Sequence, residues 1–227
     1  MCMISQVATD LSGVGWARAD HPPAAHLWMA SRRGDTESVV QLLREVKETE
    51  GCVDKILEFH WGCVGTTQVH EPNIMEGGVL ACRHDVVCTP LFIASLMGHW
   101  HVVGILVGSG ADFYNTCNTG LTPLHVAAYM GHEDVMCSLV KWGMHVDSLS
   151  ATRTTPLHEA ARSGQSKLVL ILIELGADVR TRDMYGKLPI DYGRMHGHQY
   201  VVNILVANGR VSRATTATSR DTLRCVD

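Results

Sequence analysis

Two histidines in the stretch "TPLHVAAYMGHEDV", residues 122–135, are the first candidates for chemistry. The ordinary pKa of histidine lies close to neutrality, and histidine is the commonest metal ligand. His125 and His132 are close enough along the chain to belong to a metal site or to a catalytic pair. Catalysis would also need a nucleophile beside its base, paired carboxylates or a phosphate-binding loop, and the sequence around the pair offers none of these. The two histidines therefore need another explanation.

A second group of metal-ligand residue types falls between residues 50 and 88. Its members are Cys52, His60, Cys63, His70, Cys82, His84 and Cys88. Zinc ligands usually come in pairs at short spacing, which only Cys82/His84 and His60/Cys63 approach. A chain with 13 histidines and 8 cysteines produces such pairs by chance, so we assign no metal, no cofactor and no catalytic residue. A metal-binding or enzyme-associated subunit that uses this Cys/His-rich segment is the alternative function.

The opening stretch belongs to a series of similar segments: "CTPLFIASLMGHWHVV", "LTPLHVAAYMGHEDVM", "TTPLHEAARSGQSKLV" and "KLPIDYGRMHGHQYVV". Both their prolines and their glycines recur with a step of 33 residues, at Pro90, Pro123, Pro156 and Pro189 and at Gly98, Gly131, Gly164 and Gly197. Repetition at this period with the pattern Thr-Pro-Leu-His-x-Ala resembles the ankyrin repeat, a short turn followed by two helices. The resemblance covers residues 84–207, and "HLWMASRRGDTESVVQLL" upstream fits a degenerate capping unit in which His26 replaces the proline.

Each motif residue also has a physical task. The threonines Thr89, Thr122 and Thr155 can accept hydrogen bonds from unpaired N–H groups at a helix start. The proline that follows suits the first helical position, and the glycine suits a left-handed helix end. The leucines (Leu91, Leu124, Leu157) are expected to point inward, and the alanines (Ala94, Ala127, Ala128, Ala160, Ala161) to let helices approach closely. A second amphipathic helix is predicted to end at Gly110, Gly143, Gly176 and Gly209.

We therefore predict an all-α repeat solenoid, an ankyrin-type stack of helix pairs joined by short β-hairpin turns. Residues 1–23 form an irregular N-terminal segment, residues 24–207 the repeat domain of about five units, and residues 208–227 a disordered tail. Residues 50–88 break the period and are predicted to be an insertion that forms an elongated β-hairpin or a long loop. A divergent repeat, with Gly65 at the repeat glycine, is the alternative for this segment.

Composition narrows the classes of function. The chain has 227 residues, 46% hydrophobic, and its longest apolar run is too short to cross a bilayer. No signal peptide pattern and no Asn-x-Ser/Thr acceptor occur, so we expect an intracellular protein, cytoplasmic or nuclear, whose cysteines are reduced thiols. A formal net charge of −4 argues against nucleic acid as the main ligand.

The family resemblance implies that His125 and His158 tie the turn of one repeat to its neighbour. It also implies a non-catalytic module or adaptor, expected to be a monomer, that binds another protein on a concave face made by hairpin tips and the exposed side of each first helix. Position by position, these residues are Arg32, Arg33, Leu96, Met97, Asn118, Thr119, Leu121, Tyr129, Met130, Thr152, Thr154, Arg162, Ser163, Met184, Tyr185, Lys187, Met195 and His196.

Overall fold

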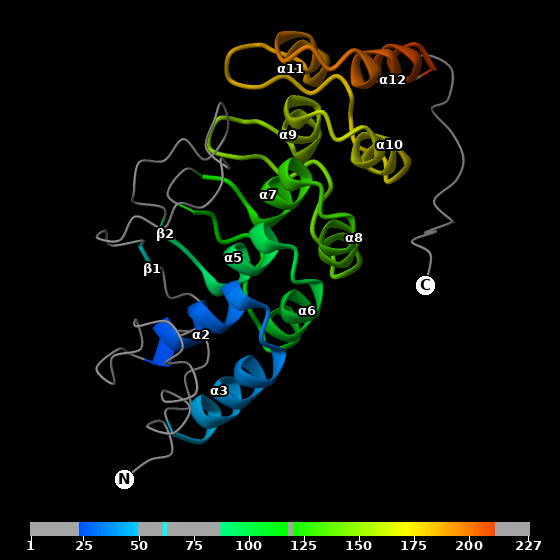
Figure 1. The fold of residues 1–227 in the computed structure, drawn as a ribbon. Helices are drawn as coiled ribbons and strands as arrows, with labels where there is room; N and C mark the ends of the chain where they lie inside the picture. Colours follow the sequence, from blue (N-terminus) through cyan, green and yellow to red (C-terminus); the bar gives the residue numbers. More distant parts are fainter. Residues whose placement is uncertain (1–22, 50–60, 63–86, 118–119, 212–227) are drawn as a thin grey trace.

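The helices of the chain form two rows, with hairpin turns that project from the first row (Figure 1). The computed structural model describes residues 23–49, 61–62, 87–117 and 120–211. The inner row consists of α2 (Pro23–Arg33), α5 (Pro90–Met97), α7 (Pro123–Met130), α9 (Pro156–Ser163) and α11 (Pro189–Met195). The outer row consists of α3 (Thr36–Thr49), α6 (Trp100–Gly108), α8 (Glu133–Lys141), α10 (Ser166–Glu174) and α12 (Gln199–Val211). The predicted all-α stack is confirmed.

The inner helices α5, α7 and α9 begin and end as the motif predicts. Proline occupies the start of α5, α7, α9 and α11, and the hydroxyl of Thr89 accepts the Phe92 N–H at 3.2 Å. In the last repeat, where Leu188 replaces the threonine, the Asp191 carboxylate accepts the Leu188 N–H at 2.9 Å. Gly98, Gly131 and Gly164 close their helices with φ between 77° and 89°, the left-handed region that disfavours any residue with a Cβ.

One predicted helix end is wrong. Gly110, Gly143 and Gly176 have positive φ angles of 100°, 101° and 91°, and each lies just beyond an outer helix. Gly209, in contrast, lies inside α12, which continues to Val211. The left-handed turn is needed where the chain leaves the outer helix for the next hairpin, and after Gly209 the described chain continues as helix.

Two apolar clusters hold the stack together. The larger one lies between the rows and includes the fully buried Leu124, Leu157 and the repeat alanines, as predicted. The smaller one lies on the hairpin side of α2, α5 and α7 and contains Trp28, Phe92 and Leu121. The indole N–H of Trp28 donates to the Cys88 carbonyl at 3.1 Å, so the first repeat is tied to the start of the second.

The first two described repeats are direct neighbours although residues 50–86 separate them in sequence. Helix α2 packs on α5 and α3 packs on α6, the same arrangement as between later repeats. A short antiparallel pair, β1 (Trp61–Gly62) and β2 (Val87–Cys88), places Trp61 opposite Cys88. The remaining residues of the predicted hairpin, including Gly65 of the alternative divergent repeat, lie outside the described residues. Among the described helices, none is both long and apolar enough to cross a membrane.

Candidate functional site

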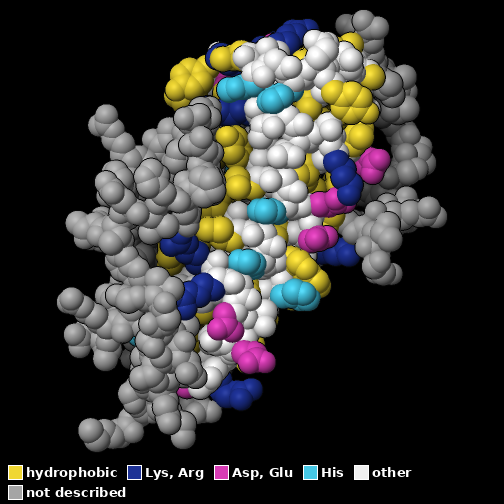
Figure 2. Space-filling model, viewed as in Figure 1, with side chains coloured by type: hydrophobic (Ala, Val, Ile, Leu, Met, Phe, Trp, Pro, Cys, Tyr) yellow, Lys and Arg dark blue, Asp and Glu magenta, His cyan; other side chains and the backbone are white. Residues whose placement is uncertain are grey.

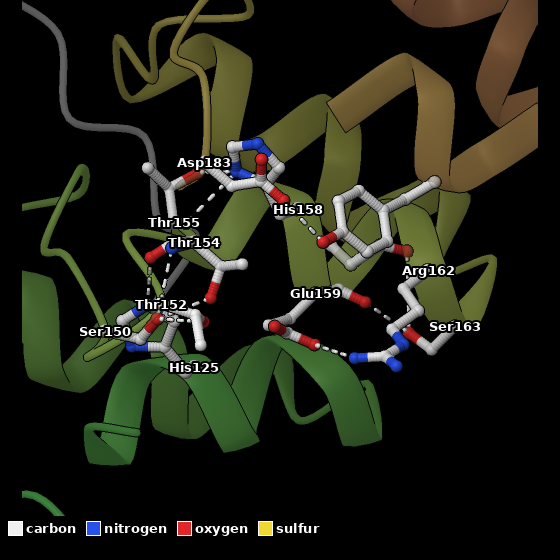
Figure 3. A network of polar contacts seen from close by, with 12 residues as sticks. His125, Ser150, Thr152, Thr154, Thr155, His158, Glu159, Arg162, Ser163 and Asp183 are labelled. Atoms are coloured by element: carbon white, nitrogen blue, oxygen red, sulfur yellow. Dashed lines mark hydrogen bonds and ion pairs between the residues drawn. The ribbon is translucent and has the colours of Figure 1, made fainter. Parts of the chain in front are cut away.

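The histidine of the Thr-Pro-Leu-His motif joins two successive repeats. In the third repeat, Nδ1 of His125 accepts the Thr122 N–H at 3.4 Å and lies 2.8 Å from the Thr122 hydroxyl. Its Nε2 lies 2.8 Å from the Thr154 carbonyl in the next hairpin (Figure 3). Since a carbonyl only accepts, Nε2 carries the proton and the ring is neutral. His158 repeats the pattern with Thr155 and with the Lys187 carbonyl, at 3.3 Å.

These buried imidazoles are poorly suited to catalysis. Both nitrogens of His125 are engaged, and its side chain is fully buried. Burial lowers the pKa of His125 to about 4 and also lowers the pKa of His158. A general base needs access to a substrate proton, and neither ring offers a nitrogen for it. His125 and His158 therefore have a structural task.

A second row of contacts joins the repeats where the two helices of each unit meet. The imidazole of His99 lies 3.0 Å from the Arg32 carbonyl through Nε2, and that of His132 lies 2.9 Å from the Leu96 carbonyl. Gln165 takes this place in the next repeat, and His198 Nε2 lies 3.0 Å from the Arg162 carbonyl. Figure 2 shows histidine side chains spaced along this face of the molecule. His99, His132 and His198 are therefore also ties between neighbouring repeats.

The hairpin turns are also linked to one another. The Ala151 N–H donates to the Gly120 carbonyl at 3.2 Å, and the Met184 N–H donates to the Thr152 carbonyl at 3.0 Å. We call the surface formed by the hairpin residues 117, 120–121, 150–154 and 183–187 and by the exposed ends of the inner helices the inner face. Because backbone bonds connect the hairpins, the inner face is a continuous surface over several repeats.

Glu159 is an acid at a register position that is apolar in the two preceding repeats, where Ile93 and Val126 occupy it. Its side chain is 2% exposed, and burial raises the pKa of its carboxyl to about 7. Oε2 lies 3.8 Å from Nη1 of Arg162 and has no hydrogen-bond partner among the described residues (Figure 3). The Arg162 Nε is likewise buried and has no such partner.

Tyr192 lies at the centre of a polar group in the last repeat. Its hydroxyl donates to the Asp183 carboxylate at 2.6 Å, and Asp183 also accepts the N–H groups of Tyr185 and Lys187. Although burial acts to raise it, these hydrogen bonds hold the pKa of Asp183 below its ordinary value. The Arg162 guanidinium and the Lys187 ammonium lie 5.8 Å and 5.7 Å from the Tyr192 ring centroid.

The predicted partner-binding residues differ in exposure. Exposed side chains belong to Arg33, Met184, Tyr185, Met195 and His196. Partly buried side chains belong to Arg32, Leu96, Met97, Tyr129, Met130, Thr152, Arg162, Ser163 and Lys187. Asn118 and Thr119 lie outside the described residues.

For Leu121 and Thr154 the prediction of an accessible side chain is wrong, because each is only 4% exposed. Leu121 belongs to the smaller apolar cluster. The Thr154 hydroxyl lies 2.6 Å from that of Ser150 inside the hairpin. Sequence reasoning missed Glu159, Asp183 and Tyr192 at this face. An ionisable residue in an otherwise apolar register row was the available signal for Glu159.

Most of the Cys/His-rich segment lies outside the described residues. Of its candidate metal ligands only Cys88 is described, and its side chain is buried. Over residues 23–49, 61–62, 87–117 and 120–211, no group of three or more His, Cys, Asp or Glu residues is placed to hold a metal ion. The other six candidates lie outside these ranges.

The chain matches a known family of repeat proteins over most of its length. The family model described as "Ankyrin repeats (3 copies)" matches residues 27–150 and 143–215, which together span most of the chain. A search of curated proteins returned no match. The matched residues contain the stacked helix pairs, the left-handed glycines and the bridging histidines described above. The chain belongs to the ankyrin repeat family.

Proposed function

We propose that this chain is a non-catalytic interaction module or adaptor that binds a partner protein on its inner face. Ankyrin repeats generally mediate protein–protein interaction. The observation that carries the proposal is the exposure of large side chains on this face: Met184, Tyr185 and Met195 are 56%, 68% and 61% exposed. Tyr and Met are enriched at protein interfaces, and none of these three side chains belongs to either apolar cluster.

The same face continues toward the middle repeats. Tyr129 and Arg162 occupy equivalent positions one repeat apart, and Met130 follows Tyr129 at the end of α7. All three side chains are partly exposed, so together with the last repeat they form one continuous candidate patch. The proposed module acts as a monomer in the cytoplasm or the nucleus. This part of the proposal rests on the sequence patterns alone.

Affinity capture from the native cell, quantified by mass spectrometry, tests the proposal. Replacing Tyr129, Met130 and Arg162 together with alanine should release at least one captured protein while leaving the helical circular dichroism signal intact. If the three include a hot spot, the loss should exceed about 1 kcal/mol in binding free energy. The matched control replaces one aromatic, one apolar and one cationic residue of the outer row, Tyr200, Leu170 and Lys141, with alanine. The proposal would be overturned if the first variant still captured every partner and the control variant lost one. Binding would then lie on the outer row.

A further inference from the structure

Two acids of the last two repeats, Glu159 and Asp183, are buried, and a third, Asp191, is already paired. Asp183 is 5% exposed and its carboxylate is saturated by the Tyr192 hydroxyl and two backbone N–H groups. Asp191 accepts the Leu188 N–H and lies 3.6 Å from Arg194. Glu159 is buried beside Arg162. Each of these three carboxylates is therefore buried or already has a hydrogen-bond or ion-pair partner.

The cations of the same region are not neutralised to the same degree. Lys187 is a hairpin residue whose ammonium lies 3.3 Å from the thioether sulfur of Met195, which carries no charge. Among the described residues no carboxylate lies within ion-pairing distance of that ammonium. Arg162 has only the buried Glu159 nearby, and its Nε has no hydrogen-bond partner within the described parts of the chain. Both cations lie near the ring of Tyr192, so two successive repeats each place a positive charge beside this side chain.

Neighbouring groups support a positive local potential. His196 is exposed at the end of α11, and its pKa is lowered by partial burial and by the charge of Arg162. Arg182 is held in the hairpin by a hydrogen bond to the Gly186 carbonyl at 2.6 Å. The exposed apolar side chains of Met184, Tyr185 and Met195 belong to the same hairpin and helix.

From this arrangement we infer that the inner face of the last two repeats selects a protein segment in which aspartate or glutamate lies beside apolar side chains. The segment's carboxylate contacts Lys187 and Arg162, and its apolar side chains pack on Met184, Tyr185 and Met195. The inference rests on the proposed function and adds the chemistry of the partner. Charge complementarity of this kind governs which partner is chosen and how fast it associates more than total affinity.

Polyanionic nucleic acid is the competing ligand for such a cationic spot. The whole chain carries a formal net charge of −4, and phosphate binding would leave the exposed Met and Tyr side chains without apolar partners. The arrangement of apolar and cationic side chains therefore favours an acidic peptide segment.

The probe is a phage-displayed library of random peptides selected on the full chain. Selection should enrich peptides that combine Asp or Glu with Leu, Phe or Tyr. A fluorescently labelled enriched peptide is then titrated by anisotropy against the wild type, Lys187→Gln and the matched control Lys141→Gln, which removes the same charge from exposed α8. Lys187→Gln should weaken binding about two- to five-fold, the range of an exposed ion pair, and Lys141→Gln should not. Added NaCl should reduce this difference.

The outcomes separate the inference from the proposed function. Enrichment of uncharged or basic peptides that still lose binding when Met184, Tyr185 and Met195 become alanine overturns the inference and leaves the proposed function standing. Acidic peptides that bind Lys187→Gln as tightly as Lys141→Gln would have their carboxylates away from Lys187. This result would also overturn the inference. Stronger competition by single-stranded DNA than by the acidic peptide would assign the spot to nucleic acid. The proposed function itself would be overturned by peptides that bind two variants as tightly as they bind the wild type. These are the alanine variant of Met184, Tyr185 and Met195 and the alanine variant of Tyr129, Met130 and Arg162.

Discussion

The imidazole of His132 fills the space that a side chain on Gly98 would require. A Cβ atom at Gly98 would lie 2.7 Å from Nδ1 and Cε1 of that ring, closer than Cβ atoms approach other atoms in proteins. The ring is held there because its Nε2 donates to the Leu96 carbonyl at 2.9 Å. Gly98 is therefore required twice, once for its φ of 81° and once for the neighbouring repeat.

Alanine substitution should separate these two requirements. Gly197 has a φ of 74°, and a Cβ atom at this position would meet no other atom within 4 Å, so Gly197→Ala should cost only the left-handed backbone penalty of about 1–2 kcal/mol. Gly98→Ala should cost a further 1–3 kcal/mol, roughly the range of core overpacking. Gly131→Ala should fall between them, because its neighbour is the end of the flexible Gln165 side chain. Urea denaturation measures all three, and equal losses for Gly98 and Gly197 would contradict the steric explanation.

A double-mutant cycle checks that the His132 ring is the cause. In the background of His132→Ala, the added cost of Gly98→Ala should drop toward the value for Gly197→Ala. If Gly98→Ala costs as much stability in the His132→Ala background as in the wild type, the clash is not with the His132 ring.

Acid should destabilise the stack through His125. The folded-state pKa is lowered to about 4 from an ordinary 6.5, so the unfolded chain binds more protons between these values. The free energy of unfolding should therefore fall as the pH drops from about 6.5 to 4, by at most about 3 kcal/mol from this residue. His125→Gln should be less stable at pH 7 but should lose less stability on acidification. Urea denaturation at pH 7 and pH 5 measures the difference, and identical acid losses in both proteins would count against a neutral buried ring.

The contribution of Glu159 to the free energy of unfolding should depend on pH in the opposite direction. Its folded-state pKa is raised to about 7 from 4.5, so the folded protein binds more protons in this window and the free energy of unfolding falls as the pH rises through it. Glu159→Gln removes the titration, and its stability relative to wild type should increase from pH 5 to pH 8 by at most about 3 kcal/mol. Thermal unfolding at the two pH values is the measurement. An effect that is the same at both would mean that the carboxyl is ionised without penalty.

Replacement of Arg153 by glycine should stabilise the folded protein. Among the described residues it is the non-glycine residue with positive φ, 60°, and it lies at the hairpin position that Gly120 and Gly186 occupy in the neighbouring repeats. Relief of about 1–2 kcal/mol of left-handed strain is partly offset by the greater freedom of glycine in the unfolded chain, about 0.4–1 kcal/mol. Arg153→Gly should thus raise the free energy of unfolding slightly, whereas Arg153→Val should lower it. Greater stability for the valine variant would be incompatible with this backbone conformation.

Much of the fold followed from local patterns. The recurring Pro, Gly and Thr-Pro-Leu-His residues predicted the helix starts, the left-handed turns and the inward leucines because each of these depends on backbone geometry and helical spacing. The same patterns misplaced one boundary, at Gly209, because a glycine ends a helix only where the chain must turn.

The candidate site was predicted less completely. Leu121, Thr154 and Lys187 occupy equivalent positions, each one repeat apart, yet only the side chain of Lys187 is partly exposed. Exposure at a repeated position depends on which neighbours cover it, and those neighbours come from other repeats. Sequence spacing carries no such information.

The sequence by itself therefore determined the repeat unit, its helices and its family, since these rest on interactions within about 33 residues of chain. Tertiary structure decided the rest. It placed α2 against α5 and α3 against α6 although residues 50–86 separate them in sequence, buried the Glu159 carboxyl, and placed Arg162 and Lys187 each near the ring of Tyr192. Each of these depends on stacking between units, because burial and electrostatic environment are properties of the assembled neighbours rather than of any one repeat.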